Sequence, residues 1–356
     1  MPLTVYTHFD TGAPTLSGTT ALSKMRDVLK ACLVDGYGDK PAAGWTMPHD
    51  VSGGFSLSNG DGVVSFTARA TDHNSLDVYV MESITDASTK IPSGVNRRSG
   101  VWSDLENAGT SVRHYLVFNP SSSQAGFNYS LHGNKWTVVA DEKTCIAYLY
   151  GLNSSGQVQE FVNSSSTSTC IYIGKYWPYS GALVGPETFI AIAGNRGTNQ
   201  PGGGFDYTNA TPSNTAQLNT SLLRNPFTGT QTLGSSLILG ATATKGEPSA
   251  GQEPTTPIPD RLCFSRLRLR GVGSNLNGAT ISTQTSGLGT LRGVVAENDL
   301  SYATPQSWLG SLSGKPTAAI PEVFAGIDLP GGVKVVPLFS GIYNPARFVL
   351  ADPAFW

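Results

Sequence analysis

The chain has 356 residues, enough for one large architecture or for two domains with a sizeable buried core. Its 41 glycines and 22 prolines exceed average usage while charged residues fall to 13%, about half the usual share, which favours many short strands joined by tight turns. The formal net charge of −2 argues against a protein that coats nucleic acid, and no apolar run reaches the ~18 residues of a membrane span.

The N-terminal region predicts a strand followed by one amphipathic helix. Residues 3–9 have the β-branched and aromatic composition of a strand. A helix over 20–34 is predicted from an N-cap at Thr19 or Thr20 and from Gly36 just beyond its end. Its apolar stripe, which we expect to pack against one face of a sheet, consists of Leu22, Met25, Val28, Leu29, Cys32 and Leu33.

Short strands continue between residues 44 and 118. Asn59-Gly60-Asp61-Gly62 predicts a tight turn between two of them, and residues 71–74 predict another. Residues 82–110 are polar and rich in turn formers, so we expect a long excursion over the sheet there. A strand resumes at 111–118.

Residues 136–150 predict the centre of the fold. Two runs of β-branched and aromatic residues are interrupted by Asp141-Glu142-Lys143, which is the pattern of a hairpin. The second run carries apolar residues on both faces, so we expect that strand to be covered on both sides. Residues 170–174 form a third run, and we expect it to pair beside the second in a central antiparallel meander.

The second half of the chain alternates strand-like runs with long polar or proline-rich segments. Residues 195–217 have the composition of an irregular loop, and the four prolines of 246–259 predict an extended segment. Strand-like runs lie at 189–193, 237–240, 261–270, 290–296, 333–339 and 346–351.

These elements predict a mainly β fold with a minor α component. We expect an antiparallel, β-sandwich-like body with one N-terminal amphipathic helix packed on a sheet and long irregular loops. We divide the chain into a β-rich domain over 1–198, a linker over 199–217 and a second β-rich domain over 218–356.

The four cysteines lie far apart in the sequence, at Cys32, Cys145, Cys170 and Cys263. The first residues lack the basic start and apolar core of a signal peptide, so we expect a cytoplasmic origin and buried free thiols. A Cys145–Cys170 bridge is the less favoured alternative, and it requires that their strands be neighbours.

Catalytic and cofactor-binding motifs are absent from the sequence. Residues 310–314 have the wrong spacing for a nucleophile elbow and fail as a phosphate loop, and residues 287–293 miss the dinucleotide fingerprint by one position. The sequence lacks Cys-x-x-Cys and His-Glu-x-x-His patterns. We therefore predict no catalytic residue, no cofactor and no metal.

Three pairs of His and Asp residues have two readings. Convergence on a metal or a general base is one; local hydrogen bonding at turns and strand ends is the other, and we favour it because only adjacency links the pairs. The pairs are His8 with Asp10, His49 with Asp50, and Asp72 with His73.

Two groups of residues are candidates for an interface. Three arginines alternate with leucines from 266 to 270, and we read them as a charged edge of a strand or as a subunit contact, well ahead of nucleic-acid binding. Aromatic residues gather around Pro178 and at the C-terminus, where we expect them to pack against a neighbour or the chain's own body. The candidates are Tyr176, Trp177, Tyr179, Arg266, Arg268, Arg270, Phe355 and Trp356.

Three segments carry a resemblance to a known group of proteins. Residues 5–18 (Val-Tyr-Thr-His-Phe-Asp-Thr-Gly-Ala-Pro, then Leu-Ser-Gly), the helix end with its glycine-rich continuation over 32–46, and the run 136–144 resemble largely uncharacterised virion structural proteins of tailed bacteriophages. The likeness is strongest over 4–46 and 134–175. These motifs consist of turn glycines, a helix end and core aromatics, so the resemblance implies a place in the particle and transfers no catalytic residue.

The resemblance implies a non-enzymatic virion component, most simply in the tail or baseplate. It would be assembled in the host bacterial cytoplasm and bind other virion proteins and copies of itself, and it would involve no nucleic acid. A capsid decoration protein and a host-receptor binder are alternatives within this class. We further expect the segments 82–110, 195–217 and 246–259 to supply contacts that order on assembly.

A protein that binds or hydrolyses envelope polysaccharide is the second class. Sugar rings stack on exposed indoles, for which the candidates are Trp45, Trp102, Trp177 and Trp308. A glycoside hydrolase would also need two carboxylates about 5–10 Å apart. The acidic residues considered for that role are Glu142, Glu160, Glu187, Glu297 and Asp299.

Overall fold

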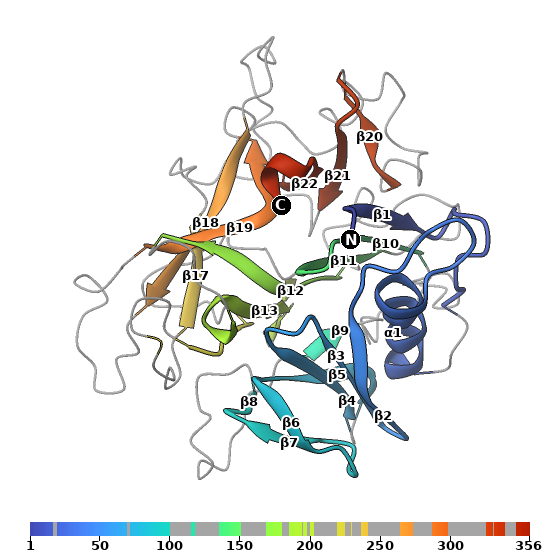
Figure 1. The fold of residues 1–356 in the computed structure, drawn as a ribbon, viewed down its shortest axis with the longest axis vertical. Coiled ribbons are helices and arrows are strands. Elements are labelled where there is room, and N and C mark those ends of the chain that lie inside the picture. Colours follow the sequence, from blue (N-terminus) through green and yellow to red (C-terminus); the bar gives the residue numbers. More distant parts are fainter. Residues whose placement is uncertain are drawn as a thin grey trace.

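The structure is a computed structural model, and it shows a mainly antiparallel β protein with a helix near the N-terminus (Figure 1). This confirms the predicted fold class. The residues described are 1–16, 20–69, 72–99, 115–117, 135–150, 169–179, 185–193, 195–197, 200–202, 219–224, 229, 236–240, 264–272, 287–297, 325–329, 331–338 and 347–356.

The N-terminal strand and helix form as the sequence predicts. Strand β1 spans Thr4–Thr7, and helix α1 spans Ala21–Lys30 and continues as a π-helical turn, η1, over Ala31–Asp35. The Thr20 side chain accepts a hydrogen bond from the Ser23 N–H, which satisfies one of the free donors of the first turn. The chain then leaves the helix at Gly36, whose φ of 78° suits a glycine.

A six-stranded sheet follows the helix. Its strands run in the order β2-β3-β4-β5-β8, with β9 also paired to β5. They are β2 (Thr46–Val51), β3 (Gly54–Ser58), β4 (Val63–Arg69), β5 (Asp72–Met81), β8 (Arg98–Ser99) and β9 (Tyr115–Val117).

Of the two turns predicted in this sheet, one is confirmed and the other is tighter than predicted. The predicted turn at 59–62 joins β3 to β4, and Asn59 Oδ1 accepts from the N–H groups of Asp61 and Gly62. The reversal expected at 71–74 is tighter than predicted, because β5 already begins at Asp72, opposite Arg69. Within the predicted excursion over 82–110, the described part contains a hairpin of β6 (Ser83–Asp86) and β7 (Ser93–Val95).

The predicted central meander is confirmed, and it belongs to a larger, curled sheet of twelve strands. The meander consists of β10 (Lys135–Ala140), β11 (Thr144–Tyr150) and β12 (Thr169–Pro178). The main path runs β1-β10-β11-β12-β19-β22-β21-β20, with β13, β16, β17 and β18 paired off it. The remaining strands are β13 (Phe189–Ala193), β16 (Asn219–Leu222), β17 (Ser236–Gly240), β18 (Phe264–Val272), β19 (Gly287–Glu297), β20 (Ile327–Asp328), β21 (Lys334–Leu338) and β22 (Arg347–Ala351). A separate hairpin pairs β14 (Asn195–Gly197) with β15 (Gln200–Gly202). It lies within 195–217, so the prediction of an irregular loop is wrong for these residues.

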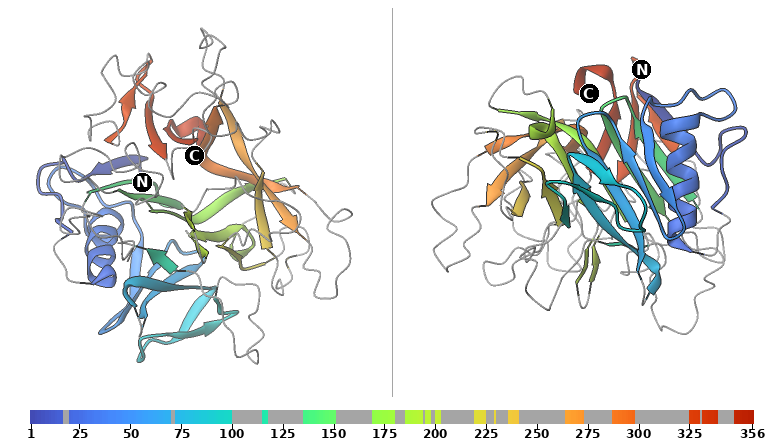
Figure 2. Two further views of the ribbon diagram at one scale, coloured as in Figure 1. Left: turned by 180° about the vertical axis from the view of Figure 1, so that it is seen from behind. Right: turned by 60° about the horizontal axis from the view of Figure 1, so that its bottom comes forward.

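The central strands are covered on both faces, as predicted for β11. One face packs against α1 and the six-stranded sheet, and the other faces the C-terminal strands (Figures 1 and 2). Alternate residues of β11 enter the two cores: Cys145, Ala147 and Leu149 lie in the first, and Ile146 and Tyr148 in the second. A strand buried on both faces therefore explains why its apolar residues do not alternate with polar ones.

The cysteines are buried free thiols, as expected, at Cys32, Cys145 and Cys170. The alternative of a Cys145–Cys170 bridge is wrong, although β11 and β12 are neighbours. Cys145 pairs with Ile173 in the register and packs on the helix side, whereas Cys170 packs on the opposite side of the same sheet. Cys263 lies outside the described residues.

The large sheet takes strands from both sides of the segment 199–217. Strand β13 pairs with β16, and β12 pairs with β19. The two predicted domains thus share a sheet, and a boundary at 199–217 stays a prediction. The proline-rich segment 246–259 lies outside the described part of the chain.

Candidate interaction surface

The eight predicted interface residues separate by burial. Trp177 and Tyr179 are 45% and 53% exposed, whereas Tyr176 and Trp356 are only 2% and 7% exposed and belong to the chain's own core. Residues 176 and 177 follow each other in β12, so their side chains point to opposite faces of the strand. Trp177 and Tyr179 are therefore the aromatic candidates that a partner can reach.

The end of β12 that carries these two rings is held by β19. Trp177 pairs with Thr290, and the Tyr179 N–H donates to the Leu288 carbonyl oxygen at 2.9 Å. A side chain at Gly289 would overlap the backbone of Trp177 and Pro178, so this close pairing of the strands requires glycine there. The aromatic pair thus projects from paired strand backbone.

Beneath Trp177 lies a buried ion pair that joins β19 to the turn between β10 and β11. The Arg292 guanidinium carbon is 5.6 Å from the centre of the Trp177 ring, within the range of a cation–π contact. Its Nη2 donates to Asp141 Oδ2 at 2.6 Å, and its Nη1 donates to Thr144 Oγ1 at 2.6 Å. Arg292 and Asp141 are each 8% exposed. The guanidinium is therefore fixed on one side by hydrogen bonds and supports the indole on the other.

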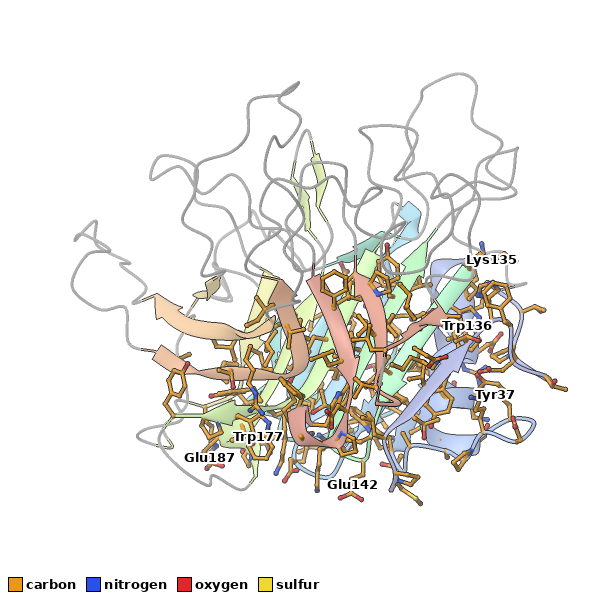
Figure 3. The ribbon with its side chains drawn as sticks, turned by 90° about the horizontal axis from the view of Figure 1, so that it is seen from above. Tyr37, Lys135, Trp136, Glu142, Trp177 and Glu187 are labelled. Atoms are coloured by element: carbon orange, nitrogen blue, oxygen red, sulfur yellow. The ribbon has the colours of Figure 1, made fainter. Side chains whose placement is uncertain are left out.

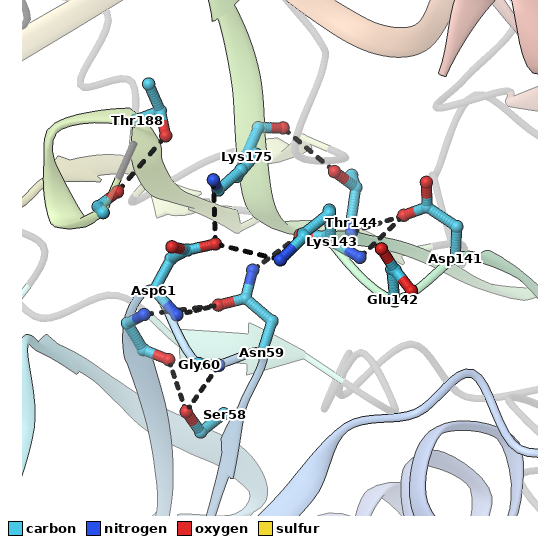
Figure 4. A network of polar contacts seen from close by, with 12 residues as sticks. Ser58, Asn59, Gly60, Asp61, Asp141, Glu142, Lys143, Thr144, Lys175 and Thr188 are labelled. Carbon is cyan, nitrogen blue, oxygen red and sulfur yellow. Dashed lines mark hydrogen bonds and ion pairs between the residues drawn. The ribbon is translucent and has the colours of Figure 1, made fainter. Parts of the chain in front are cut away.

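A second set of polar contacts holds that turn against the six-stranded sheet (Figure 4). Asn59 Nδ2 donates to the Lys143 carbonyl oxygen at 2.6 Å. Asp61 Oδ2 lies 2.9 Å from Lys175 Nζ and 3.6 Å from Lys143 Nζ. Thr144 Oγ1 donates to the Lys175 carbonyl oxygen at 3.0 Å. The β3–β4 turn, the β10–β11 turn and β12 are thereby joined at one end of the molecule.

The N-terminus completes this end. The Met1 ammonium lies 2.6 Å from Glu142 Oε2, and its hydrogen bond and charge lower the pKa of the Glu142 carboxyl. The Met1 residue is 64% exposed, and the side chains of Glu142 and Lys143 are 50% and 40% exposed. Figure 3 shows Trp177 and Glu142 along the same edge of the molecule. We call Met1, Glu142, Lys143, Trp177 and Tyr179 the aromatic end.

The C-terminal candidates pack on their own chain. The Arg266 guanidinium lies 5.0 Å from the Phe355 ring centre and donates to the Ala354 carbonyl oxygen at 2.8 Å. Trp356 Nε1 donates to the Leu350 carbonyl oxygen at 2.7 Å. The C-terminal Phe-Trp therefore packs on the protein's own body, which is one of the two arrangements expected from the sequence.

The reading of the arginine-rich strand as a charged sheet edge is wrong. Strand β18 pairs with β17 through Arg268 and Arg270 and with β19 on its other side, so it is an interior strand. The side chains of Arg268 and Arg270 lie outside what the structure describes. A subunit contact at this strand stays a prediction.

The described His and Asp residues make structural hydrogen bonds. His8 Nδ1 is 3.2 Å from the Trp136 carbonyl oxygen, and Asp10 Oδ2 accepts from the Tyr37 hydroxyl at 2.8 Å. His49 is buried between Ser56 Oγ and the Thr89 carbonyl oxygen, and Asp50 pairs with Arg26. Within the described ranges, no group of three or more His, Cys, Asp or Glu residues is placed to hold a metal ion. The side chains of Asp72 and His73 are not among those described.

The tryptophans considered for stacking on sugar rings separate by burial. Trp45 is 3% exposed and donates from Nε1 to the Asp141 carbonyl oxygen, so it is a core residue. Trp177 is exposed. Of the carboxylates, Glu142 pairs with the N-terminus, and Glu187 lies in the 3₁₀ turn η3 (Pro186–Thr188) before β13. The side chains of Trp102, Trp308, Glu160, Glu297 and Asp299 lie outside the described part.

Sequence reasoning missed Arg292, the residue on which Trp177 rests. The signal was a single arginine in the apolar run Leu291-Arg292-Gly293-Val294, where a buried charge requires a partner. The partner, Asp141, lies 151 positions away. The sequence does not show that β12 pairs with β19, so it gives no reason to connect Arg292 with Asp141.

No protein-family model matches this chain, and a search of curated proteins finds no match. Among the residues described, no helix is both long enough and apolar enough to cross a membrane.

Proposed function

We propose that this chain is a non-enzymatic structural component of a tailed-bacteriophage virion, most simply in the tail or baseplate, which binds neighbouring virion proteins and copies of itself. The virion assignment is supported by the resemblance of residues 4–46 and 134–175. These two segments pack together: Trp136 Nε1 donates to the Pro14 carbonyl oxygen at 3.1 Å, and Trp45 Nε1 to the Asp141 carbonyl oxygen at 2.9 Å. The resembling residues thus belong to one packed unit rather than to scattered patches.

The binding role rests on one observation, the exposure of Trp177 and Tyr179 on a fixed support. Tryptophan and tyrosine are enriched among the residues that carry most of the energy of protein interfaces. Their strand is paired on β19, and the Trp177 ring lies on a buried, hydrogen-bonded guanidinium. Side chains that are already ordered lose little conformational entropy on binding, which favours a docking role for this pair.

Immunogold labelling of purified phage particles from a host that produces this chain tests the virion assignment. We expect label at the tail or its tip, with the chain present among the proteins of density-purified particles. Label on the head would favour the capsid decoration alternative. Complete absence from purified particles would overturn the proposal.

Binding of envelope polysaccharide is a second candidate, favoured by the exposed Trp177 ring with Tyr179 two residues later. If the chain binds envelope polysaccharide, the isolated protein should be retained on immobilised lipopolysaccharide, and Trp177→Ala should abolish this retention. We expect no hydrolysis of peptidoglycan or lipopolysaccharide by the isolated protein. Turnover that disappears when one carboxylate is changed would contradict the non-enzymatic assignment.

A further inference from the structure

We propose that the aromatic end is the contact between two copies of this chain, related by a two-fold axis that passes between residues 142 and 143 of the β10–β11 turn. The inference rests on the proposed function in taking the aromatic end as a docking surface, and it names the partner. The exposed apolar and charged groups at that end support this contact.

Three of the five large apolar side chains that are exposed in the described part of the chain belong to the aromatic end. Met1, Trp177 and Tyr179 are 64%, 45% and 53% exposed. Contacts connect Met1 with Trp177 through the structure: Met1 binds Glu142, the neighbouring Asp141 binds Arg292, and Arg292 supports Trp177. Tyr179 follows Trp177 by two residues. Large apolar groups gathered on one face of a soluble protein mark a surface that a partner covers.

The charges at this end select a partner of mixed charge. Glu142 is paired with the N-terminal ammonium, Asp141 with Arg292, and Asp61 with Lys175. A strongly acidic or strongly basic partner would meet as many repelling as attracting groups there. A second copy brings the same mixture of charges, so the surface is suited to itself.

Two adjacent exposed charges make the match specific. Glu142 and Lys143 follow each other in the β10–β11 turn. Each has a partner in its own chain, the N-terminal ammonium and Asp61, yet their side chains are still 50% and 40% exposed. A two-fold axis between them places Glu142 of one copy opposite Lys143 of the second copy, and the reciprocal pair forms at the same time. Residues related in this way are the signature of an isologous contact, the commonest arrangement in homomeric proteins.

Sedimentation velocity of purified protein over a wide range of concentration tests the contact. We expect a monomer–dimer equilibrium, with a dissociation constant raised at least about tenfold by Trp177→Ala, because an interface tryptophan is a typical hot spot. Phe9→Ala is the matched control, since Phe9 is 47% exposed and lies outside the aromatic end. It should leave the equilibrium unchanged.

Charge reversal tests the two-fold arrangement and contains its own control for misfolding of the variants. Glu142→Lys gives two positive charges at the turn, and Lys143→Glu gives two negative charges, so each variant alone should stay monomeric through like-charge repulsion. An equimolar mixture of the two should form heterodimers, which shows that both variants are folded. The double variant with both changes should dimerise with itself.

A wild-type chain that stays monomeric at every concentration, whether or not it binds a glycan or another virion protein, would overturn the inference. So would dimers that persist in each charge-reversed variant alone. These results are separable from the virion assignment. A monomer found in purified particles contradicts only the self-contact, and a dimer absent from particles contradicts only the virion assignment.

Discussion

Removing the charge of Arg292 while keeping most of its volume should destabilise the fold strongly. The Arg292 and Asp141 side chains are 9% and 12% exposed, and breaking a pair of this kind by removing one partner costs about 3–5 kcal/mol. In Arg292→Met the Asp141 carboxylate keeps the N–H donors of Lys143 and Thr144. We therefore expect a loss of about 3 kcal/mol in the free energy of unfolding, at the lower end of that range.

Asp141→Ala should cost more than Arg292→Met. It leaves the Arg292 guanidinium buried with Thr144 Oγ1 as its remaining described acceptor, and it removes the acceptor of the two turn N–H groups. We expect a loss of about 5 kcal/mol. Arg26→Met is the matched control, because Arg26 also pairs with an aspartate but its side chain is 37% exposed. It should cost about 1 kcal/mol or less.

Urea denaturation measures these differences, with unfolding followed by tryptophan fluorescence and by circular dichroism so that coincident transitions can be checked. The reasoning is refuted if Arg292→Met and Arg26→Met unfold at the same urea concentration with the same dependence on urea. It is also refuted if Asp141→Ala is more stable than Arg292→Met.

Three further predictions follow from burial. Cys32→Asp should cost several kcal/mol, because it places a charge at a position with 0% exposure; a variant that melts like the wild type contradicts the packing of the helix. Gly62→Ala should lower the melting temperature, since a methyl at Gly62 would lie 2.5 Å from the Phe189 ring; an unchanged melting temperature contradicts this. Burial raises the pKa of the Cys32, Cys145 and Cys170 thiols, so alkylation at pH 8 followed by mass spectrometry should label them only after unfolding. Because the folded state keeps these protons, stability should also fall as the pH rises above about 8.5, the ordinary thiol pKa, and a rise would contradict the burial.

Local sequence patterns were sufficient for the N-terminal helix and the central hairpin. The spacing of Met25, Leu29 and Cys32 predicted the buried helix stripe, and the interruption at Asp141-Glu142-Lys143 predicted the β10–β11 hairpin. Such signals depend on neighbours within a few residues, so they are readable without the tertiary structure.

Features that depend on distant partners were not predictable in this way. Whether β18 is an edge or an interior strand depends on its pairing with β17, and the sequence does not specify that pairing. The aromatic cluster was recognised, but not which rings are exposed: Tyr176 is buried and Trp177 is not, because the fold decides which face of β12 is covered. Cys145 and Cys170 lie on neighbouring strands but on opposite faces, a difference of register that composition does not reveal.

Cryo-electron microscopy of intact particles tests the central claim most directly, that this chain is a virion component that docks through its aromatic end. We predict density for several symmetry-related copies at the tail or baseplate, with Trp177 and Tyr179 buried in a contact with a neighbouring chain. Particles without this chain, or with it present and both rings facing solvent, would contradict the claim.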